Sequence, residues 1–414
     1  MPHVVFVAPR FLENTNRYVR AFAELPGVQL SVVSQDPDTS IPKALKPHIA
    51  AHYQCASLDS DSLIAAVRAI SRGVGPIDRV TGALEQLQLS LADVRAALDI
   101  DGVRPDVARN FRDKDRMKDV LRAAGVPVAK SGLATSPAAL RKFIDMVGLP
   151  VIVKPQAGVG ARSTFRITSA ADLDALEAKG LAPTAERPLQ VEQFVRAREH
   201  TCETVTIRGV PVWRSGTRYL PTPLDVLENP WMQYCVLLPR ETEDTEWTRF
   251  APINAAALAA LFGKAASTAA GTALTHMEWF LLEDGSALVN EVGVRPPGVQ
   301  IMPLMSIAHE SNFIADWAEL VAFDRFTPKE RRWAAGAAFF RGQGSGEKVV
   351  SVNGVDDAVR RVGEALVEMR APRVGQARAD SYEGEGWALV RHATTEGVKQ
   401  ALLALVENVQ VRYG

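Results

Sequence analysis

Cysteine is scarce in this chain of 414 residues, which contains only Cys55, Cys202 and Cys235. Three scattered cysteines are too few for a disulfide framework and lack the spacing of a zinc site, so we expect a reducing, cytoplasmic environment. An excess of charge of either sign is also missing, because the formal net charge is −1. This balance predicts neither a nucleic acid nor an anionic membrane surface as a partner.

Several further patterns are absent. The N-terminus has no basic segment followed by a long apolar stretch, and no later apolar run reaches the length of a membrane span, so we expect neither export nor membrane insertion. No Ser-His-Asp or Cys-His arrangement is recognisable, which argues against a side-chain nucleophile. Hydrophobic residues at 47% and charged residues at 23% fit a globular protein of roughly two to four structural units.

What the chain does contain is two apolar segments around a turn, with carboxylates on both. The runs 275–280 and 289–298 flank the turn sequence Glu-Asp-Gly, which predicts an antiparallel hairpin with Glu278 near Glu291. Two carboxylates beside Arg295 suit Mg²⁺ with nucleotide phosphates, because the cation prefers carboxylate oxygens and the guanidinium prefers phosphate or carboxylate oxygens. On this hairpin alone, an ordinary cross-strand ion pair explains the same residues equally well.

Strand periodicity predicts which hairpin residues share a face. On a regular strand, Glu291, Gly293 and Arg295 face one side and Asn290 faces the other. His276 shares the face of the first carboxylate, two residues away, and is a candidate base for an amine. A structural role is the more common one for a lone histidine in a strand.

A lysine and a glycine-rich loop follow another predicted strand. Residues 149–155 read Leu-Pro-Val-Ile-Val-Lys-Pro, so the strand ends at Lys154, and the loop after it contains Gly158 and Gly160. Small residues let backbone N–H groups approach an anion, and the lysine adds a charge to the same phosphate. No Gly-Lys-Ser/Thr follows the glycines, so this is not a Walker loop. A plain turn is the alternative interpretation.

Further motifs complete an ordered series. An Asp-Lys helix with Lys114 ends at Gly-Val-Pro, and the Val-Lys-Pro strand with its glycine loop comes next. Val-Glu-Gln-Phe-Val at 191–195, a Glu-x-x-x-Glu strand from Glu199, and the Glu…Asn-Glu-x-x-x-Arg-Pro hairpin follow. In this order the motifs resemble the ATP-grasp superfamily, and within it the carboxylate-amine ligases, including the L-amino acid ligases.

The resemblance implies an α/β chain with the α+β ATP-grasp fold. It divides the chain into an N-terminal Rossmann-like domain (1–105), a small subdomain with a glycine-rich lid (106–190), a large subdomain with the metal site (191–326), and a C-terminal extension packed on the large subdomain (327–414). Apolar runs at 3–8 and 28–34 around a helical segment at 16–24 independently predict the βαβ start of the first unit. In the extension, helices are expected at 355–368 and 396–408.

The resemblance also implies roles for single residues, with ATP and Mg²⁺ or Mn²⁺ as cofactors. Contacts with the nucleotide are implied for Lys114 and Lys154 at the phosphates, Gly158 and Gly160 in the lid, Glu192, Gln193, Phe194 and Val195 along the adenine edge, Glu199 at the ribose, and Phe280 on the base. Glu278 and Glu291 would bind the metal. Arg295 would steady the transferring phosphoryl group or the substrate carboxylate.

The implied reaction activates a carboxylate as an acylphosphate, releases ADP and joins the acyl group to an amine, with amino acids as expected substrates. Family members usually carry an asparagine metal ligand where this chain has Gly293, so a second metal ion is less expected than the first. Asn290, which is expected to face away, does not replace it. The Pro-rich segment 208–249 is a candidate for substrate specificity, and Arg341 is a candidate substrate contact; simple packing and a glycine-rich turn are the alternatives.

Other functions remain open at this stage. A formate-dependent transformylase-like enzyme or a carboxylase-type enzyme would use the same acylphosphate chemistry. A non-catalytic ATP-binding regulatory protein is the alternative from a different class, and Gly293 is its sequence hint. Several relatives dimerise through the N-terminal unit, so a homodimer is an open expectation.

Overall fold

The N-terminal unit of the computed structural model is a parallel sheet with helices on both faces. The structure describes residues 1–156, 164–241, 245–379 and 381–414. The strand order is β3-β2-β1-β4. Its elements are β1 (His3–Val7), α1 (Glu13–Ala23), β2 (Gln29–Ser34), β3 (Ile49–Gln54), α2 (Ser60–Val74), β4 (Arg79–Thr81) and α3 (Gln88–Ala97). Val4 and Phe6 pack into one core and Val5 and Val7 into another, which is why β1 is apolar throughout. The predicted βαβ start is confirmed.

The small subdomain is an antiparallel sheet of order β5-β8-β6-β7, reached through two helices. The elements are α4 (Pro105–Arg112), α5 (Lys114–Ala123), β5 (Ser131–Ala134), α6 (Pro137–Val147), β6 (Val151–Pro155), β7 (Phe165–Ile167), α7 (Ala170–Ala178) and β8 (Leu189–Gln193). Val151 and Val153 pack in a core with residues of α6 and α7. Because side chains alternate along a strand, Ile152 and Lys154 lie on the opposite face, where they line a cavity.

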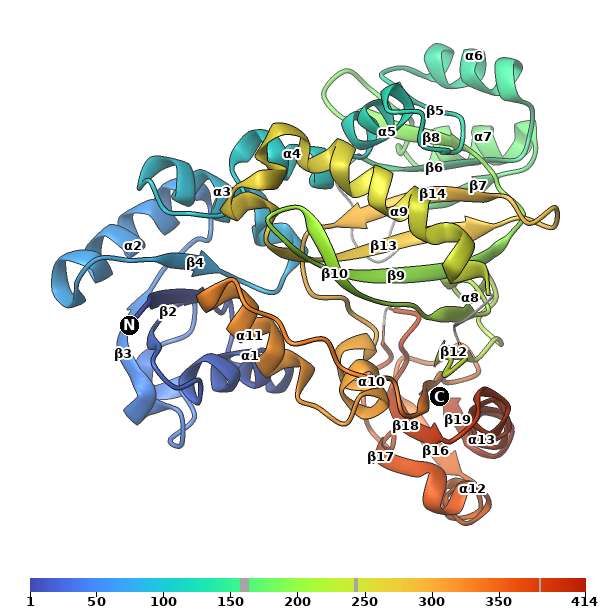
Figure 1. The fold of residues 1–414 in the computed structure, drawn as a ribbon. Coiled ribbons are helices and arrows are strands. Elements are labelled where there is room, and N and C mark those ends of the chain that lie inside the picture. Colours follow the sequence, from blue (N-terminus) through green and yellow to red (C-terminus); the bar gives the residue numbers. More distant parts are fainter. Residues whose placement is uncertain (157–163, 242–244, 380) are drawn as a thin grey trace.

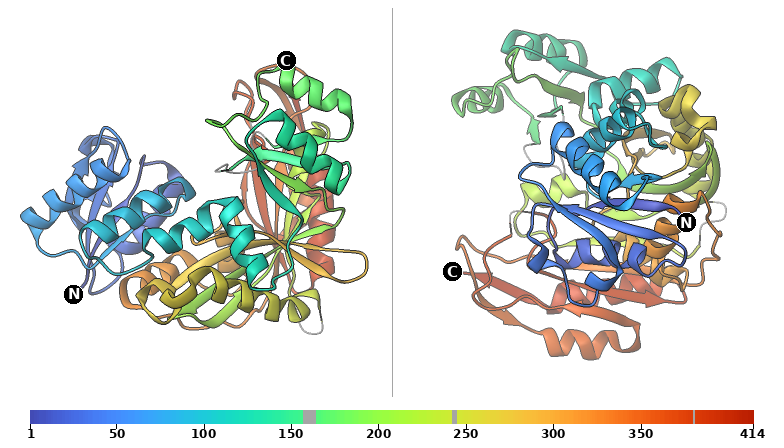
Figure 2. Two further views of the ribbon diagram at one scale, coloured as in Figure 1. Left: turned by 90° about the horizontal axis from the view of Figure 1, so that it is seen from above. Right: turned by 90° about the vertical axis from the view of Figure 1, so that its left-hand side faces the viewer.

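One large sheet carries both the large subdomain and the C-terminal extension (Figures 1 and 2). Its order is β14-β13-β9-β11-β12-β15-β18-β17, with β10 paired to β9. The large subdomain comprises β9 (Arg198–Ile207), β10 (Val210–Ser215), β11 (Arg218–Leu220), α8 (Pro223–Glu228), β12 (Tyr234–Leu238), α9 (Glu246–Phe262), β13 (Ala273–Leu281), β14 (Ala287–Gly293), α10 (Ile301–Ala308) and α11 (Phe313–Phe323). The predicted hairpin is therefore present as β13 and β14.

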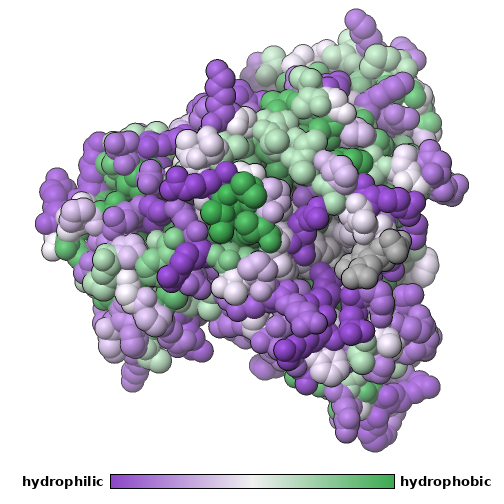
Figure 3. All heavy atoms as spheres, in the orientation of Figure 1, coloured by the Kyte–Doolittle hydropathy of each residue, from purple (hydrophilic) through white to green (hydrophobic). Residues whose placement is uncertain are grey.

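The C-terminal extension joins this sheet through the antiparallel pairing of β12 with β15. Its elements are β15 (Ala334–Phe340), β16 (Val349–Asn353), α12 (Val355–Val362), β17 (Leu366–Arg370), β18 (Gly386–His392), α13 (Thr395–Asn408) and β19 (Gln410–Tyr413). In Figure 3 the visible face of the extension is mainly hydrophilic. The helix expected at 396–408 is present, but the one expected at 355–368 ends at Val362. Gly363, at φ +55°, stops it; a 3-10 turn (Gly363–Ala365) follows, and from Leu366 the chain pairs with β18 as β17.

Helix α11 fastens the N-terminal unit to the large subdomain, and Figure 1 shows it beside α1. The ring of Trp317 on α11 meets the rings of Tyr18 and Phe22 on α1 edge-on, at centroid distances of 5.4 and 5.6 Å. Arg79 of β4 also pairs with Asp324, with 3.3 Å between the guanidinium and the carboxylate. Buried aromatic packing of this kind fixes the N-terminal unit against the sheet that carries the candidate site.

One helical segment, Glu246–Ser267, is long and apolar enough to cross a membrane by length and composition. The sequence-based expectation that no segment reaches that length was therefore wrong. The apolar residues of this segment lie on two faces of the helix. Phe250 and Leu258 are buried in the core, whereas Ala255 and Ala256 lie on the exposed face. Phe250 stacks on Trp279 of β13 at 3.9 Å between ring centroids, as expected for a helix that packs on a sheet.

The first turn of α9 also holds a titrating carboxylate. Glu246 accepts hydrogen bonds from Arg218 at 3.0 and 2.6 Å and lies 3.2 Å from His200 Nε2. Burial opposes its ionisation, but the bonds to His200 and Arg218 outweigh it and lower the pKa to about 2. Because its pKa is depressed, ionised Glu246 stabilises the folded state at any pH above the ordinary pKa of a glutamate. This contribution is lost as the pH falls toward 2. We expect Glu246→Gln to reduce the melting temperature at pH 7 more than at pH 3; equal reductions at both pH values would contradict this.

Candidate active site

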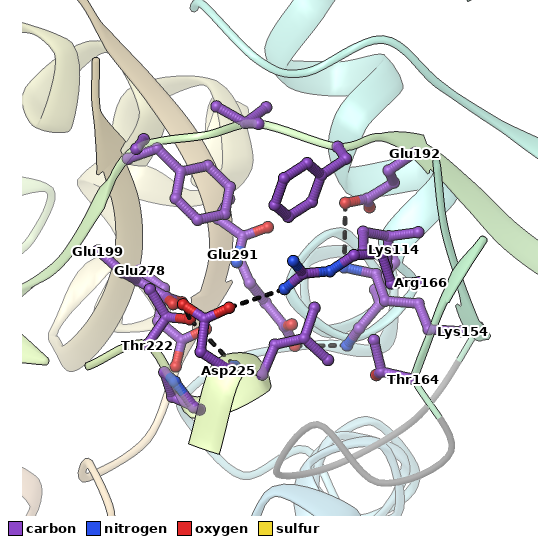
Figure 4. Close-up of a pocket in the computed structure, with 18 of the residues that line it drawn as sticks. Lys114, Lys154, Thr164, Arg166, Glu192, Glu199, Thr222, Asp225, Glu278 and Glu291 are labelled. Atoms are coloured by element: carbon purple, nitrogen blue, oxygen red, sulfur yellow. Dashed lines mark hydrogen bonds and ion pairs between the residues drawn. The ribbon is translucent and has the colours of Figure 1, made fainter. Parts of the chain in front are cut away.

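A cavity of about 400 Å³ lies between the face of the small sheet that carries Lys154 and the hairpin β13–β14 (Figure 4). The residues for which a nucleotide, metal or catalytic role was predicted line it throughout the described part of the chain: Lys114, Lys154, Glu192, Gln193, Phe194, Val195, Glu199, His276, Glu278, Phe280, Glu291 and Arg295. Arg341, a candidate substrate contact, is not among the lining residues and instead donates to the carbonyls of Val226 and Met232. Gly158 and Gly160 lie outside the described residues. Four separate stretches of sequence thus converge on one space, and the roles assigned to their residues remain predictions.

Two lysines in the cavity are anchored by carboxylates, and Figure 4 draws both contacts. Lys114 Nζ lies 2.5 Å from Glu291 Oε1, and Lys154 Nζ lies 3.1 Å from Glu192 Oε2. Burial opposes the charge on Lys154, but Glu192 and Glu291 outweigh it and raise the pKa of Lys154. Behind them, Lys118 donates to the Val289 carbonyl at 3.2 Å, and burial lowers its pKa to about 8. The cavity therefore presents ammonium groups in fixed positions to any bound anion.

The pKa values of two carboxyl groups in the cavity, Glu291 and Glu199, are shifted in opposite directions. Burial opposes ionisation of Glu291, but Lys114 and Lys154 outweigh it and lower its pKa to about 2. For Glu199, burial and then the nearby charge of Glu278 raise the pKa well above the ordinary value. Carboxyl groups whose pKa values are shifted by burial and by specific charged neighbours are typical of functional sites. The low pKa of Glu291 suits a cation ligand, whereas burial and Glu278 make the carboxylate form of Glu199 less favourable.

His276 lies between two carboxylates. Its Nδ1 is 2.8 Å from Glu203 Oε1 and its Nε2 is 3.6 Å from Glu278 Oε1. Burial opposes the imidazolium, but the hydrogen bonds to Glu203 and Glu278 outweigh it and raise the pKa of His276 to about 9. At neutral pH the ring therefore already carries its second proton. This state suits orientation of Glu278 better than acceptance of a proton from an amine.

Arg295 is held by the N-terminal unit. Its Nε and Nη2 donate to Glu85 Oε2 at 3.0 and 2.7 Å, and Arg112 Nη1 donates to Glu85 Oε1 at 2.9 Å. Burial opposes the charge on Arg295, but Glu85 outweighs it and raises the pKa of the guanidinium. Glu85 thus belongs to the cavity, which no local sequence pattern indicates. The sequence also gives no sign that Tyr382, from the C-terminal extension, lines the same cavity.

A β-bulge corrects the prediction that Asn290 faces away from Glu291. In the hairpin, Glu278 pairs with Glu291 and Trp279 pairs with Val289, so Asn290 has no partner. One extra residue breaks the alternation. Both Asn290 and Glu291 line the cavity, while the valines on either side, at 289 and 292, are buried in one core. The amide of Asn290 therefore shares the face of the two carboxylates.

These side chains fit a hard divalent cation. In the described residues, no group of three or more His, Cys, Asp and Glu side chains is arranged to hold a metal by itself. Glu278 and Glu291 form a directly opposed pair, and Asn290 beside them adds an amide oxygen. Mg²⁺ and Mn²⁺ prefer such oxygen donors, and Mg²⁺ often keeps waters and phosphate oxygens as its remaining ligands. The donor set therefore fits a cation that arrives with a nucleotide.

Comparison with known sequences gives local matches of low identity. No protein-family model matches the chain. It is 25% identical over 115 residues to a carbamoyl phosphate synthase large chain of Myxococcus xanthus, covering 28% of this chain and 11% of that protein. It is 26% identical over 333 residues to the uncharacterized protein y4rH of Sinorhizobium fredii, covering 78% of this chain and 65% of that one. The matches thus span about a tenth of the first relative and about two thirds of the second.

Comparison with solved structures extends over the whole chain. The L-amino acid ligase of Bacillus licheniformis superposes with a TM-score of 0.77 at 18% identity, covering 100% of this chain and 99% of that one. The N5-carboxyaminoimidazole ribonucleotide synthetase of Thermotoga maritima gives a TM-score of 0.72 at 17% identity, with 100% of both chains covered. The motif order and these superpositions agree on the fold: along its whole length the chain has the fold of these two solved enzymes.

Proposed function

We propose that this protein is an ATP-dependent ligase that activates a carboxylate as an acylphosphate and joins it to an amine, forming an amide or peptide bond with an amino acid. One observation carries the proposal. A single cavity collects two anchored lysines, an opposed pair of glutamates and a buried arginine, and no recognisable nucleophile motif accompanies them. Phosphoryl transfer needs positioned positive charge rather than a side-chain nucleophile.

Each group has a role in this reaction. Lys114 and Lys154 bind the phosphates, and the opposed glutamates hold the divalent cation, which neutralises developing charge when bound. Arg295, kept in place by Glu85, steadies the transferring phosphoryl group or the carboxylate. Glu199 holds the ribose hydroxyls. Water must be excluded, because an exposed acylphosphate hydrolyses before an amine can attack it.

The test is ADP release with ATP and Mg²⁺ across carboxylic acids and amino acids, supplied singly and in pairs, with products identified by mass spectrometry. Release that needs a pair, with a product lighter than the pair by one water, supports the ligase. Transfer of labelled oxygen from carboxylate to phosphate separates an acylphosphate from phosphorylation of a hydroxyl. ATP binding without ADP release for any pair would favour the regulatory alternative.

Asn290 provides a prediction about the cation. We expect Asn290→Ala to weaken Mn²⁺ binding in the presence of a non-hydrolysable ATP analogue roughly tenfold, about 1.4 kcal/mol, because one oxygen donor is lost. Electron paramagnetic resonance of free and bound Mn²⁺ measures this without turnover. Adding Gly293→Asn should restore part of the affinity; a Cβ there would lie 3.4 Å from Arg295 Cγ, an ordinary contact. Unchanged Mn²⁺ affinity in the alanine variant would show that Asn290 is not a ligand.

A further inference from the structure

Arg166 connects the small sheet to helix α8 at the wall of the cavity. It lies on β7 of the small sheet, and its Nη2 is 2.8 Å from Asp225 Oδ1 and 3.0 Å from Glu228 Oε2 on α8 of the large subdomain. Arg166 and Asp225 both line the cavity, and Figure 4 draws the contact between them. Neither residue belongs to the motifs that identify the site.

The same guanidinium covers a residue of the expected adenine segment. Arg166 Cζ lies 4.3 Å above the ring centroid of Phe194, within the range of a cation–π contact. Phe194 directly follows β8, and its backbone N–H donates to the Pro150 carbonyl at 3.1 Å. The backbone of this segment is therefore fixed by the small sheet, while its aromatic side chain is held by Arg166.

Helix α8, which receives Arg166, is itself held at both ends. At its start, Thr222 accepts a hydrogen bond from the Asp225 backbone N–H at 3.3 Å and donates to Asp225 Oδ2 at 2.8 Å. At its end, Arg341 of the C-terminal extension donates to the carbonyls of Val226 and Met232 at 2.9 and 2.7 Å. The positive charge of Arg341 therefore stabilises the C-terminal end of this short helix. Asp225 uses one carboxylate oxygen for Thr222 and keeps the other for Arg166.

We propose that Arg166, Asp225 and Glu228 form a clasp that positions Phe194 and closes the base end of the nucleotide cavity by joining the two subdomains. This inference rests on the proposed function, because it requires a nucleotide in the cavity. The ion pairs of the clasp must break before the base can leave the cavity, so the clasp sets how long the nucleotide stays bound. Arg166 is a positioning residue, since it acts through Phe194 and through the closure of the two subdomains.

The physical case depends on the convergence of several contacts. The side chains of Arg166, Asp225 and Glu228 are 22, 37 and 33% exposed, so each ion pair alone is weak. The same guanidinium, however, contacts two carboxylates on one anchored helix and one aromatic ring. Its Nε is buried and has no hydrogen-bond partner among the described residues. A planar guanidinium can stack and pair at once, whereas an ammonium group cannot.

The test measures nucleotide dissociation from the full chain with a fluorescent ATP analogue in stopped flow. We expect Arg166→Ala to increase the dissociation rate roughly tenfold, and Arg166→Lys to have an intermediate effect because it keeps the charge but not the stacking. Asp225→Asn and Glu228→Gln should each give a smaller increase. The matched control is Arg141→Ala, which removes an ion pair with Glu177 inside the small subdomain, 2.5 Å long.

The dissociation rates of the variants either support or overturn the clasp. Faster dissociation in the Arg166 variants, with the Arg141 variant and the melting temperature of the nucleotide-free chain unchanged, supports the clasp. Equal dissociation from the wild type and Arg166→Ala overturns it while leaving the ligase proposal intact. An equal effect of the Arg141 variant also overturns it, because the cause would then be general loosening of the subdomain. A wild-type chain that binds no nucleotide overturns both proposals.

Discussion

Glu291→Gln is expected to reduce turnover roughly 10²- to 10³-fold, the range seen when one preorganised group that stabilises a transition state is removed. Glutamine keeps the shape of Glu291 but lacks the charge that the divalent cation needs. It also leaves Lys114 without its carboxylate partner at 2.5 Å. Turnover is measured as ADP release with the substrate pair identified for the wild type, and Mn²⁺ binding should weaken in parallel.

The matched control for this variant lies in the same hairpin. Glu283 is exposed in the turn between β13 and β14, so Glu283→Gln removes the same charge outside the cavity and should leave turnover unchanged. Wild-type turnover in Glu291→Gln would remove this residue from the metal site. A loss of turnover without any change in Mn²⁺ binding would place its role with Lys114 instead.

Lys154→Met is expected to weaken ATP binding strongly and also to destabilise the fold. The phosphate contact is lost, and Glu192, whose side chain is 6% exposed, loses its hydrogen-bonded partner. Removing one member of a buried ion pair costs about 3–5 kcal/mol. We expect the lower part of this range, because Lys118 remains 4.0 Å from Glu192. Thermal unfolding and ATP titration measure the two effects separately.

A second substitution separates the two consequences of Lys154→Met. Adding Glu192→Gln removes the uncompensated buried charge, so the double variant should regain most of the lost melting temperature. ATP affinity should remain low, because the cation at the phosphates is still missing. Recovery of both properties would mean that Lys154 serves only to neutralise Glu192. An unchanged ATP affinity in the single variant would exclude a phosphate contact.

The order of the motifs could be predicted because each depends on local chemistry. The Glu-Asp-Gly turn and the apolar runs around it define β13 and β14 whatever surrounds them, and Gly125, at φ +72°, follows the predicted helix that bears Lys114. The alternation of Val151 and Val153 with Lys154 likewise assigns one face of β6 to the core and the other to the cavity. Each of these patterns depends on residues that are close together in the sequence, so each can be predicted without the tertiary structure.

Errors arose where a distant partner decides the outcome. Asn290 was expected to face away, but pairing with β13 absorbs one extra residue in a bulge and turns it into the cavity. The segment 355–368 was expected to be one helix, but pairing with β18 makes its last residues, from Leu366, part of a strand. Glu85 and Arg166 act through partners 210 and 59 positions away, which no local pattern reveals.

Turns, apolar periodicity and charged strand ends are properties of short segments. The α/β class, the order of the motifs that resemble the ATP-grasp superfamily and the residues expected at the nucleotide could therefore be predicted from the sequence. The assembled structure brings these residues together, shifts the pKa values of Glu199 and Glu291 in opposite directions, and holds Arg295 and Arg166 in place. The physical reason is that burial and charge–charge distance set these properties. Both depend on elements that lie far apart along the chain and become neighbours only when the sheets are assembled.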